Sequence, residues 1–404
     1  MRILNSCYGI EAKSIMHDIG VDPYGIDIML PKTSSYLIRT GKLPNAAANI
    51  LKQEMLSLGG DAAVSRGSLT GRAKKSSCLI IGRENQLDSL IRKLRSQPFG
   101  LSRFADELQD NLANYKKRDF TVSLGKKTLD FKNKVYVMGV INLTPDSFSG
   151  DGLSAIKTGD CTGLALKRAK QMIKDGADII DLGGESSRPG TKGISVKEEL
   201  RRLLPVVRKM AKNISTPISV DTVNTEVAKA CLDCGARMIN DISGLRDRRM
   251  AKTAARHKAA VVIMHMRGNP LNMQKKTAYR SLIEDISLWL KNAVACAEDL
   301  GVSPDKIIVD PGIGFGKTVE QNLEIIKRIS DFRILGKPIL VGPSRKSFIG
   351  KVLNAGPKER ITGTLTSCVM AAERGANVVR VHDVKEVSEA LKMSAAIIRG
   401  DANA

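Results

Sequence analysis

Polar side chains recur in this chain wherever an apolar run ends. Residues 135–152 (VYVMGVINLTPDSFSGDG) begin as a β-branched apolar run, stop at Asn142 and continue into a polar, turn-rich loop. Such a run is typical of a strand buried on both faces, and α/β enzymes bind ligands beyond the carboxyl ends of parallel strands. Seven further apolar runs end in the same way, at Gly183–Gly190, Asp221, Asn240-Asp241, His265, Asp310–Gly312, Ser344–Lys346 and Arg380–Asp383.

One set of these residues suits a phosphate ligand. If the eight runs form a closed barrel, the first, second and eighth strands are neighbours and bring together Asn142, Arg188, Arg380 and His382. Guanidinium groups match phosphate oxygens with two parallel hydrogen bonds, so this set suits a di- or triphosphate. The two arginines fit a structural role equally well, in salt bridges to Glu185 or Asp383.

A second set suits a flat heterocycle that carries N–H donors and ring acceptors. It comes from the third, fourth, sixth and seventh runs and consists of Asp221, Asn240, Asp310 and Lys346. A single Asp at such a junction is usually a helix N-cap. Two such carboxylates, together with an amide and an amine, favour the ligand.

Three other motifs do not predict a function. The glycine-rich loop Gly312–Thr318 (GIGFGKT) lacks the spacing of a phosphate-binding P-loop, because Pro311 stands where its first glycine belongs. Cys231 and Cys234 form a single CxxC in a helix-like stretch, without a second pair. His265 has no partner at metal-ligand spacing, so we expect a hydrogen-bonded histidine near the barrel rim.

The elements that position these residues alternate between strands and helices. Helix-compatible stretches such as 165–174, 282–300 and 364–374 separate the apolar runs, and several end at a glycine. Eight such units in about 270 residues predict a (β/α)₈ TIM barrel, with an open doubly wound sheet as the alternative. The apolar runs lie at 135–141, 178–183, 217–220, 237–240, 260–264, 306–309, 338–342 and 377–381.

The chain divides into two expected domains. Residues 1–118 mix amphipathic helices (45–58, 84–95 and 102–117) with a strand-like run at 78–81, which predicts a small α/β accessory domain. The sequence does not indicate the role of this domain. Residues 119–404 form the catalytic barrel, preceded by a β-hairpin that turns at Gly125-Lys126.

Bulk composition limits the classes of function. The 404 residues carry a net charge of +22 but only 4% aromatic residues, too few for an extended base-stacking surface. The charge therefore favours a polyanionic substrate over nucleic acid, although a basic nucleic-acid-binding protein stays an alternative. No apolar run reaches the length of a membrane span, and no signal peptide is evident. Seven scattered cysteines suit free thiols in the cytoplasm.

The motifs together resemble those of the dihydropteroate synthases, a pterin-binding family. The resemblance covers nearly all of residues 120–404, and its motifs follow the family's order: INLTPDSFS, DLGGESSRPG, SVDT, INDISG, MHMRGNP, DPGIGFGK, SRKSFIG and RVHDV. It implies a transferase of folate biosynthesis that condenses 6-hydroxymethyl-7,8-dihydropterin diphosphate with p-aminobenzoate, releasing pyrophosphate. It also implies a homodimer with small-molecule substrates.

The resemblance gives the site residues their roles. The pterin would contact Asp221, Asn240, Met264, Asp310 and Lys346, with Arg345 beside it. The diphosphate would contact Asn142, Arg188, Arg380 and His382, with Mg²⁺ bridging through Asn142. The arylamine would be framed by Ser187, Pro189, Gly314, Phe315 and Ser347. We assign catalysis to Asp221, Asp310, Lys346, Arg380 and His382.

Two features qualify the resemblance. Asp151 lies one place from the position usual in the family, which puts its role in doubt, and residues 1–118 fall outside the familiar core. A pterin-dependent methyltransferase on the same barrel is the alternative enzyme. Such an enzyme does not need the GGESSRPG, SRKS or RVHD motifs, all of which this chain contains.

Overall fold

The chain forms two compact units, residues 1–113 and 114–404. The computed structural model describes residues 9–144, 161–185, 190–191, 193–275 and 277–401. The boundary lies inside helix α6 (Leu101–Lys116), a few residues before the division expected from the sequence. The end of α6 belongs to the second unit, because Asn114 Nδ2 donates to the carbonyl of Ile334 at 3.1 Å.

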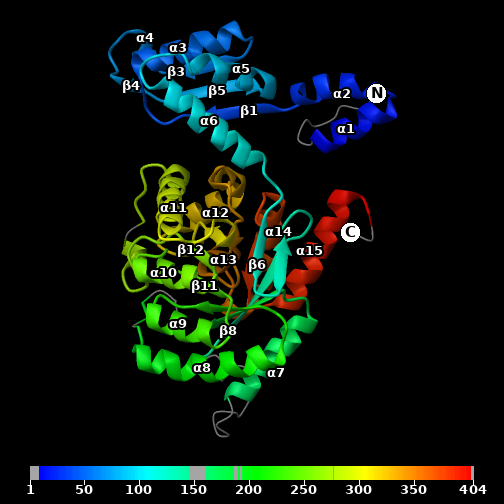
Figure 1. The fold of residues 1–404 in the computed structure, drawn as a ribbon, viewed down its shortest axis with the longest axis vertical. Helices are drawn as coiled ribbons and strands as arrows, with labels where there is room; N and C mark the ends of the chain where they lie inside the picture. The colour runs from blue at the N-terminus through cyan, green and yellow to red at the C-terminus, as the bar shows by residue number, and fades with distance from the viewer. Residues whose placement is uncertain (1–8, 145–160, 186–189, 192, 276, 402–404) are drawn as a thin grey trace. The chain divides into compact units, whose positions relative to one another are not determined.

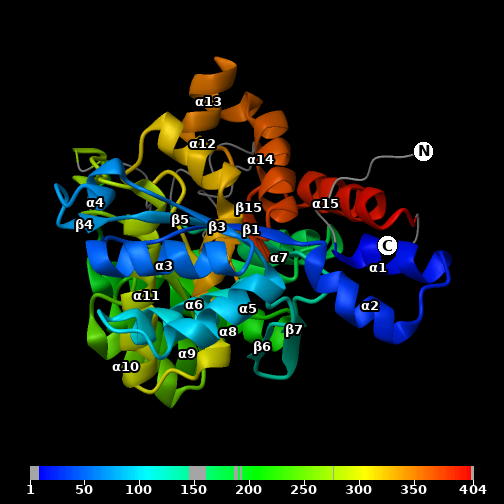
Figure 2. The same cartoon turned by 90° about the horizontal axis from the view of Figure 1, so that it is seen from above.

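The first unit is a small α/β fold. Its antiparallel sheet has the order β1-β5-β3, formed by Ser35–Arg39, Cys78–Arg83 and Asp61–Val64. Helices α3 (Asn45–Ser57) and α5 (Glu84–Leu94) pack on this sheet (Figure 2). The expected helices and strand are therefore present, and one apolar core joins them through residues such as Leu51, Ile80 and Leu90.

The second unit is a parallel eight-stranded barrel. The strand order is β13-β12-β11-β10-β9-β8-β15-β14. A parallel bridge between Val309 and Ile339, with Val309 N donating to Pro338 O at 2.9 Å, links the two end strands. The TIM-barrel prediction is thus confirmed. The strands are β8 (Tyr136–Asn142), β9 (Ile179–Gly183), β10 (Ile218–Asp221), β11 (Met238–Asp241), β12 (Ala260–Met264), β13 (Ile307–Asp310), β14 (Leu340–Val341) and β15 (Val378–Val381).

Helices surround these strands (Figure 1). The turns from helix to strand contain Gly176, Gly235 and Gly375, whose φ angles of 107°, 113° and 101° suit glycine alone. The helices are α7 (Cys161–Lys174), α8 (Val196–Asn213), α9 (Thr225–Asp233), α10 (Arg248–Arg256), α11 (Leu282–Asp299), α12 (Val319–Lys327), α13 (Ser347–Leu353), α14 (Ile361–Glu373) and α15 (Val384–Arg399). No helix in the described ranges is long and apolar enough to cross a membrane.

A β-hairpin closes the amino-terminal end of the barrel. Strands β6 (Thr121–Leu124) and β7 (Lys127–Asp130) pair antiparallel, as the sequence predicts. Leu129 is fully buried, and it shares an apolar cluster with inward-facing strand residues such as Met138 and Ile179. The hairpin therefore forms an apolar floor at the amino-terminal end of the barrel. The polar groups of the interior lie toward the carboxyl end.

Candidate active site at the carboxyl end of the barrel

The inward-facing positions change from apolar to polar along each strand. Side chains alternate in a strand, so Met138, Ile179 and Met238 face the interior near the floor, and residues two places further on face it nearer the mouth. The register aligns Asp181 with Ser219, and Asp221 with both Gly183 and Asn240. The polar layer contains Asp181, Ser219, Asp221, Asn240, Asp310 and Arg380.

Arg380 is held by two carboxylates inside the barrel. Its Nε lies 2.7 Å from Asp181 Oδ2, and its Nη2 lies 2.7 Å from Asp221 Oδ2. The structure therefore corrects the expected grouping, because Arg380 lies with the pterin set and pairs with these carboxylates rather than with Glu185 or Asp383. The reason is the register of the strands, because Arg380 aligns with Met138, four residues before Asn142 in β8.

The two aspartates of the second set are not helix caps. Helix α9 begins at Thr225 with Asn224 as its N-cap, and α12 begins at Val319 with Thr318 as its N-cap. Asp310 Oδ1 instead accepts the Gly312 N–H at 2.6 Å, so its other oxygen is left for a ligand. The alternative left open by the sequence is thereby removed for both residues.

Burial shifts the protonation of this layer. It raises the pKa of Asp221 to about 7, with Arg380 opposing the shift and the nearby Asp181 adding to it. Burial also raises the pKa of Asp310 and lowers the pKa of Lys346 to about 8. The mouth therefore holds one carboxyl group, that of Asp221, and one amine, that of Lys346, which titrate near neutral pH.

The loop after β13 forms one wall of the mouth. Phe315 is 8% exposed and belongs to a small cluster with Met264, Met266 and Met273. Lys346 lies 4.2 Å from the centre of the Phe315 ring, and its Nζ donates to the carbonyl of Ile313. Met264 and Gly314 lie in the same region, so the expected pterin and arylamine contacts are neighbours.

Asn142 and His382 lie at the outer rim. His382 Nδ1 is 3.1 Å from Ser344 Oγ, and burial, helped by the charges of Arg380 and Arg345, lowers the pKa of His382 to about 4. His382 is therefore neutral at physiological pH. Arg345 has a φ of 56° and donates from Nε to Asp383 Oδ2 at 2.9 Å, while Ser347 begins helix α13.

Several predicted residues lie outside the described part of the chain. These are Ser187, Arg188, Pro189 and Asp151. The predicted convergence of Arg188 with Asn142 is therefore untested.

Sequence reasoning missed one residue of the polar layer. Asp181 is completely buried, pairs with Arg380 and accepts from Asn240 Nδ2 at 3.2 Å. It was overlooked because chemistry was sought at strand ends, whereas Asp181 lies inside β9. A carboxylate within an apolar strand run was the signal that could have found it, because buried charges need partners.

The donor set at Asn142 is compatible with Mg²⁺. Among the residues that the structure describes, no group of three or more His, Cys, Asp or Glu side chains is placed to hold a metal ion. The side-chain oxygen of Asn142 lies over Gly183, where a Cβ on that glycine would stand only 3.1 Å from it. Mg²⁺ commonly takes one or two carboxylates and completes its shell with substrate phosphate and water. Asn142 would supply one neutral amide oxygen, and diphosphate and water would supply the others.

Comparisons with known proteins agree with this geometry. The family model for "Pterin binding enzyme" matches residues 138–382. A dihydropteroate synthase of Synechocystis sp. is 44% identical over 293 residues, which covers 72% of this chain and 99% of that protein. The chain belongs to the dihydropteroate synthase family of pterin-binding enzymes.

Two further relatives extend the comparison. The solved structure of the dihydropteroate synthase of Thermus thermophilus in complex with 4-aminobenzoate superimposes with a TM-score of 0.61, at 40% identity, and covers 69% of this chain and 99% of that one. A probable bifunctional folylpolyglutamate synthase/dihydropteroate synthase of Halobacterium salinarum is 35% identical over 393 residues. That match covers 96% of this chain and 46% of that protein, so the similarity to it reaches into residues 1–113.

Proposed function

We propose that the mouth of this barrel condenses 6-hydroxymethyl-7,8-dihydropterin diphosphate with p-aminobenzoate, giving 7,8-dihydropteroate and pyrophosphate. The observation that carries the proposal is the inward-facing layer of Asp221, Asn240, Asp310 and Arg380, in a chain of the dihydropteroate synthase family. Asn240 and Asp310 are buried, and the side chains of Asp221 and Arg380 are largely so. Two carboxylates and an amide that face the barrel interior complement the N–H donors and acceptors of an aminopyrimidine ring.

The pterin ring would bind between these groups. The free oxygen of Asp310 accepts an N–H from the ring edge, while its other oxygen stays with Gly312. Asp221 accepts a hydrogen bond from a second N–H of the ring, and the amide of Asn240 can both donate to the ring and accept from it. Lys346 points into the same space from the start of α13, where it donates to the ring's acceptor atoms.

The chemical step is a displacement at the exocyclic methylene carbon. The bond between this carbon and the diphosphate oxygen breaks with its electron pair leaving on pyrophosphate, and the amine nitrogen forms the new bond. The developing cation on the pterin favours the ionised forms of Asp221 and Asp310, and in a site of low dielectric these carboxylates stabilise it in turn. The amine then loses a proton to solvent or to pyrophosphate, so no dedicated base is needed.

The polar layer and the rim would both stabilise the departing charge. Arg380 contributes its positive charge from within the polar layer, where it pairs with Asp181 and Asp221. Neutral His382 can donate a hydrogen bond from its ring at the rim. Arg188 is assigned to the same group. Asn142 would hold Mg²⁺ together with diphosphate oxygens, and such an ion supplies positive charge to the leaving group. Positioning and charge stabilisation would therefore carry most of the rate.

The assignment of p-aminobenzoate rests on the wall formed by Phe315 and Gly314. Phe315 is mostly buried and Lys346 Nζ lies over its ring, so a flat arylamine would contact the small part of the ring that stays exposed. The Thermus thermophilus enzyme was solved with 4-aminobenzoate. Ser187, Pro189 and Ser347 complete the proposed frame.

The assembly and location are also proposals. We propose a homodimer that uses the exposed apolar side chains of α15, including Met393, Ile397 and Ile398, which are 61%, 69% and 58% exposed. Light scattering should then give about twice the chain mass of 43.8 kDa. We place the enzyme in the cytoplasm, because the six cysteines within the described residues have free thiols.

The experiment that tests this function is a product assay by mass. Purified protein is incubated with dihydropterin diphosphate, p-aminobenzoate and Mg²⁺, and with each component omitted in turn. We expect dihydropteroate only when both organic substrates are present. A protein that binds the pterin but forms no dihydropteroate would instead favour another pterin enzyme, and methyl transfer from methyltetrahydrofolate would be measured next.

A further inference from the structure

Lys317 is a buried lysine that the proposed reaction does not use. It lies in the glycine-rich loop after β13 and is 3% exposed. Its Nζ is 2.9 Å from Gly312 O, 3.0 Å from Phe315 O and 3.2 Å from His265 Nδ1. Burial lowers the pKa of His265 to about 2, so the ring is neutral and Nδ1 can accept. Burial lowers the pKa of Lys317 to about 7, with the nearby Asp310 opposing the shift. In its charged form the amine has three N–H donors, one for each of these acceptors.

The loop needs these donors because of its backbone shape. Gly312, Gly314 and Gly316 have φ angles of 74°, 83° and 61°, and the resulting turns direct carbonyl groups inward. Gly312 lies so close to His265 that a Cβ would collide with the His265 carbonyl. Buried carbonyls without donors are costly. Lys317 donates to the Gly312 and Phe315 carbonyls from inside the loop, and the Phe315 N–H also donates to Gly312 O at 3.2 Å.

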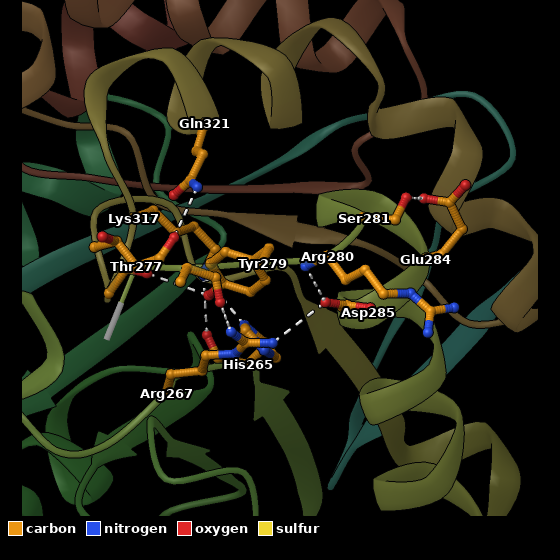
Figure 3. A network of polar contacts seen from close by, with 12 residues as sticks. His265, Arg267, Thr277, Tyr279, Arg280, Ser281, Glu284, Asp285, Lys317 and Gln321 are labelled. Atoms are coloured by element: carbon orange, nitrogen blue, oxygen red, sulfur yellow. Dashed lines mark hydrogen bonds and ion pairs between the residues drawn. The ribbon is translucent and has the colours of Figure 1, made fainter. Parts of the chain in front are cut away.

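A second set of contacts supports the outer side of the same loop. Tyr279 OH donates to Gly316 O at 3.2 Å, and Gln274 Nε2 donates to Gly314 O at 3.3 Å. The guanidinium of Arg267 lies 3.9 Å from the centre of the Tyr279 ring and pairs with Asp285 at 3.3 Å. Figure 3 shows His265, Arg267, Tyr279 and Lys317 together in this network.

We propose that Lys317 is a positioning residue for the arylamine. By joining the carbonyls on both sides of Gly314 to His265, it fixes the backbone that carries Phe315 and so sets the wall against which the arylamine stacks. The inference rests on the proposed function, which gives Gly314 and Phe315 to the arylamine. Asp221 and Asn240 lie on β10 and β11 and not on this loop. Of the pterin-binding carboxylates, only Asp310 is linked to Lys317, through Gly312, whose N–H donates to Asp310 and whose carbonyl accepts from Lys317.

Kinetics on Lys317→Met test this proposal, because methionine keeps the length of the side chain and removes its donors. We expect KM for p-aminobenzoate to rise about tenfold, which corresponds to the loss of one charge-assisted hydrogen bond. KM for the pterin diphosphate should rise less than KM for p-aminobenzoate, because of the pterin-binding carboxylates only Asp310 is linked to Lys317. The matched control is Lys337→Met. Lys337 is also buried and bonds Glu298 Oε1 at 2.6 Å and Pro304 O at 2.9 Å, but it lies before β14, at the end of the barrel away from the mouth.

Hydrogen exchange measures the loop without turnover. In Lys317→Met, amides of residues 312–318 should exchange faster than in the parent, while β9 and β10 are unchanged. Tyr279→Phe provides a milder variant if Lys317→Met does not fold. It should accelerate exchange at Gly316 and raise KM for the arylamine less than Lys317→Met.

The outcomes separate the two proposals. If the parent makes no dihydropteroate, the proposed function fails, and exchange at residues 312–318 still decides whether Lys317 fixes the loop. If the parent is active but both KM values rise equally, or exchange at 312–318 is unchanged, Lys317 has only a general structural role and this inference is wrong.

Discussion

At the scale of single residues, the site depends on three inward-facing carboxylates and on the few cationic side chains that balance their charge. Asp181 and Asp221 both pair with Arg380, and Asp310 faces Lys346 across the mouth. Removing one partner from a buried ion pair costs far more than the pair itself contributes. We infer that Asp181 fixes the position of Arg380. Asp221 can then give up its hydrogen bond from Arg380 and accept one from the ligand instead.

Replacing Asp181 tests this arrangement. In Asp181→Asn we expect binding of the diphosphate-free pterin alcohol to weaken about tenfold or more in calorimetry, because a charge-assisted hydrogen bond to Arg380 is lost. Asp178→Asn is the control. Asp178 is buried as well, but it pairs with Lys134 near the floor. Asp178→Asn should lower the free energy of unfolding and leave pterin binding intact. If Asp181→Asn binds the pterin alcohol as tightly as the parent does, Asp181 does not belong to the site.

The raised pKa of Asp221 predicts a pH dependence of stability. Between its ordinary pKa near 4 and its folded pKa of about 7, the unfolded chain has released this proton and the folded chain still holds it. The contribution of Asp221 is therefore fully present below pH 4 and is lost as pH rises to 7. Asp221→Asn has no such proton to hold. The free energy of unfolding of the parent minus that of the variant should fall across this window, and a difference that rises with pH would contradict the shift.

At the scale of the elements, a closed strand ring brings distant residues to one edge. Asp221 and Arg380 are far apart in sequence, and their side chains meet because β10 and β15 both contribute to the same inward layer. The hairpin of β6 and β7 closes the other end with apolar side chains. Chemistry and stability are thus separated between the two ends of the barrel.

The hairpin floor gives a prediction about stability alone. Leu129→Ala should lower the free energy of unfolding by about 2–5 kcal/mol, because it leaves a cavity where a fully buried leucine was. Thr128→Ala, one place along and exposed, should change it by less than about 0.5 kcal/mol. Denaturant titrations provide both values. A large loss of kcat in folded Leu129→Ala would show that floor and mouth are coupled.

The elements also show what sequence reasoning can reach. The strands were predictable because each is a continuous apolar run between glycine turns, and residues at their ends were placed in the right region. The depth of Arg380 was not predictable, since it depends on the stagger of β15 against β8. Asp181 and Lys317 were missed for a similar reason: each acts on a neighbouring group from inside a strand or loop, and only the fold shows the neighbour.

At the scale of the whole molecule, the assigned site residues all belong to the second unit. Residues 1–113 form their own core, and the match to the Halobacterium salinarum protein includes them. We predict that a fragment of residues 114–404 folds cooperatively and turns over with kcat/KM within about threefold of the full chain. Circular dichroism and the product assay would measure this. A folded but inactive fragment would mean that the first unit contributes to the site.

The most direct test of the account compares Asp310→Asn with the parent in one assay of pyrophosphate and dihydropteroate. The asparagine can keep the bond to Gly312 N–H but turns an N–H₂ toward the donors of the pterin. We predict that the parent releases one pyrophosphate for each dihydropteroate formed. The folded variant should lose roughly ten- to a hundredfold in kcat/KM, as expected for a charge-assisted hydrogen bond. An unchanged kcat/KM in Asp310→Asn, or pyrophosphate release by the parent without dihydropteroate, would contradict the assignment of this mouth as the condensation site.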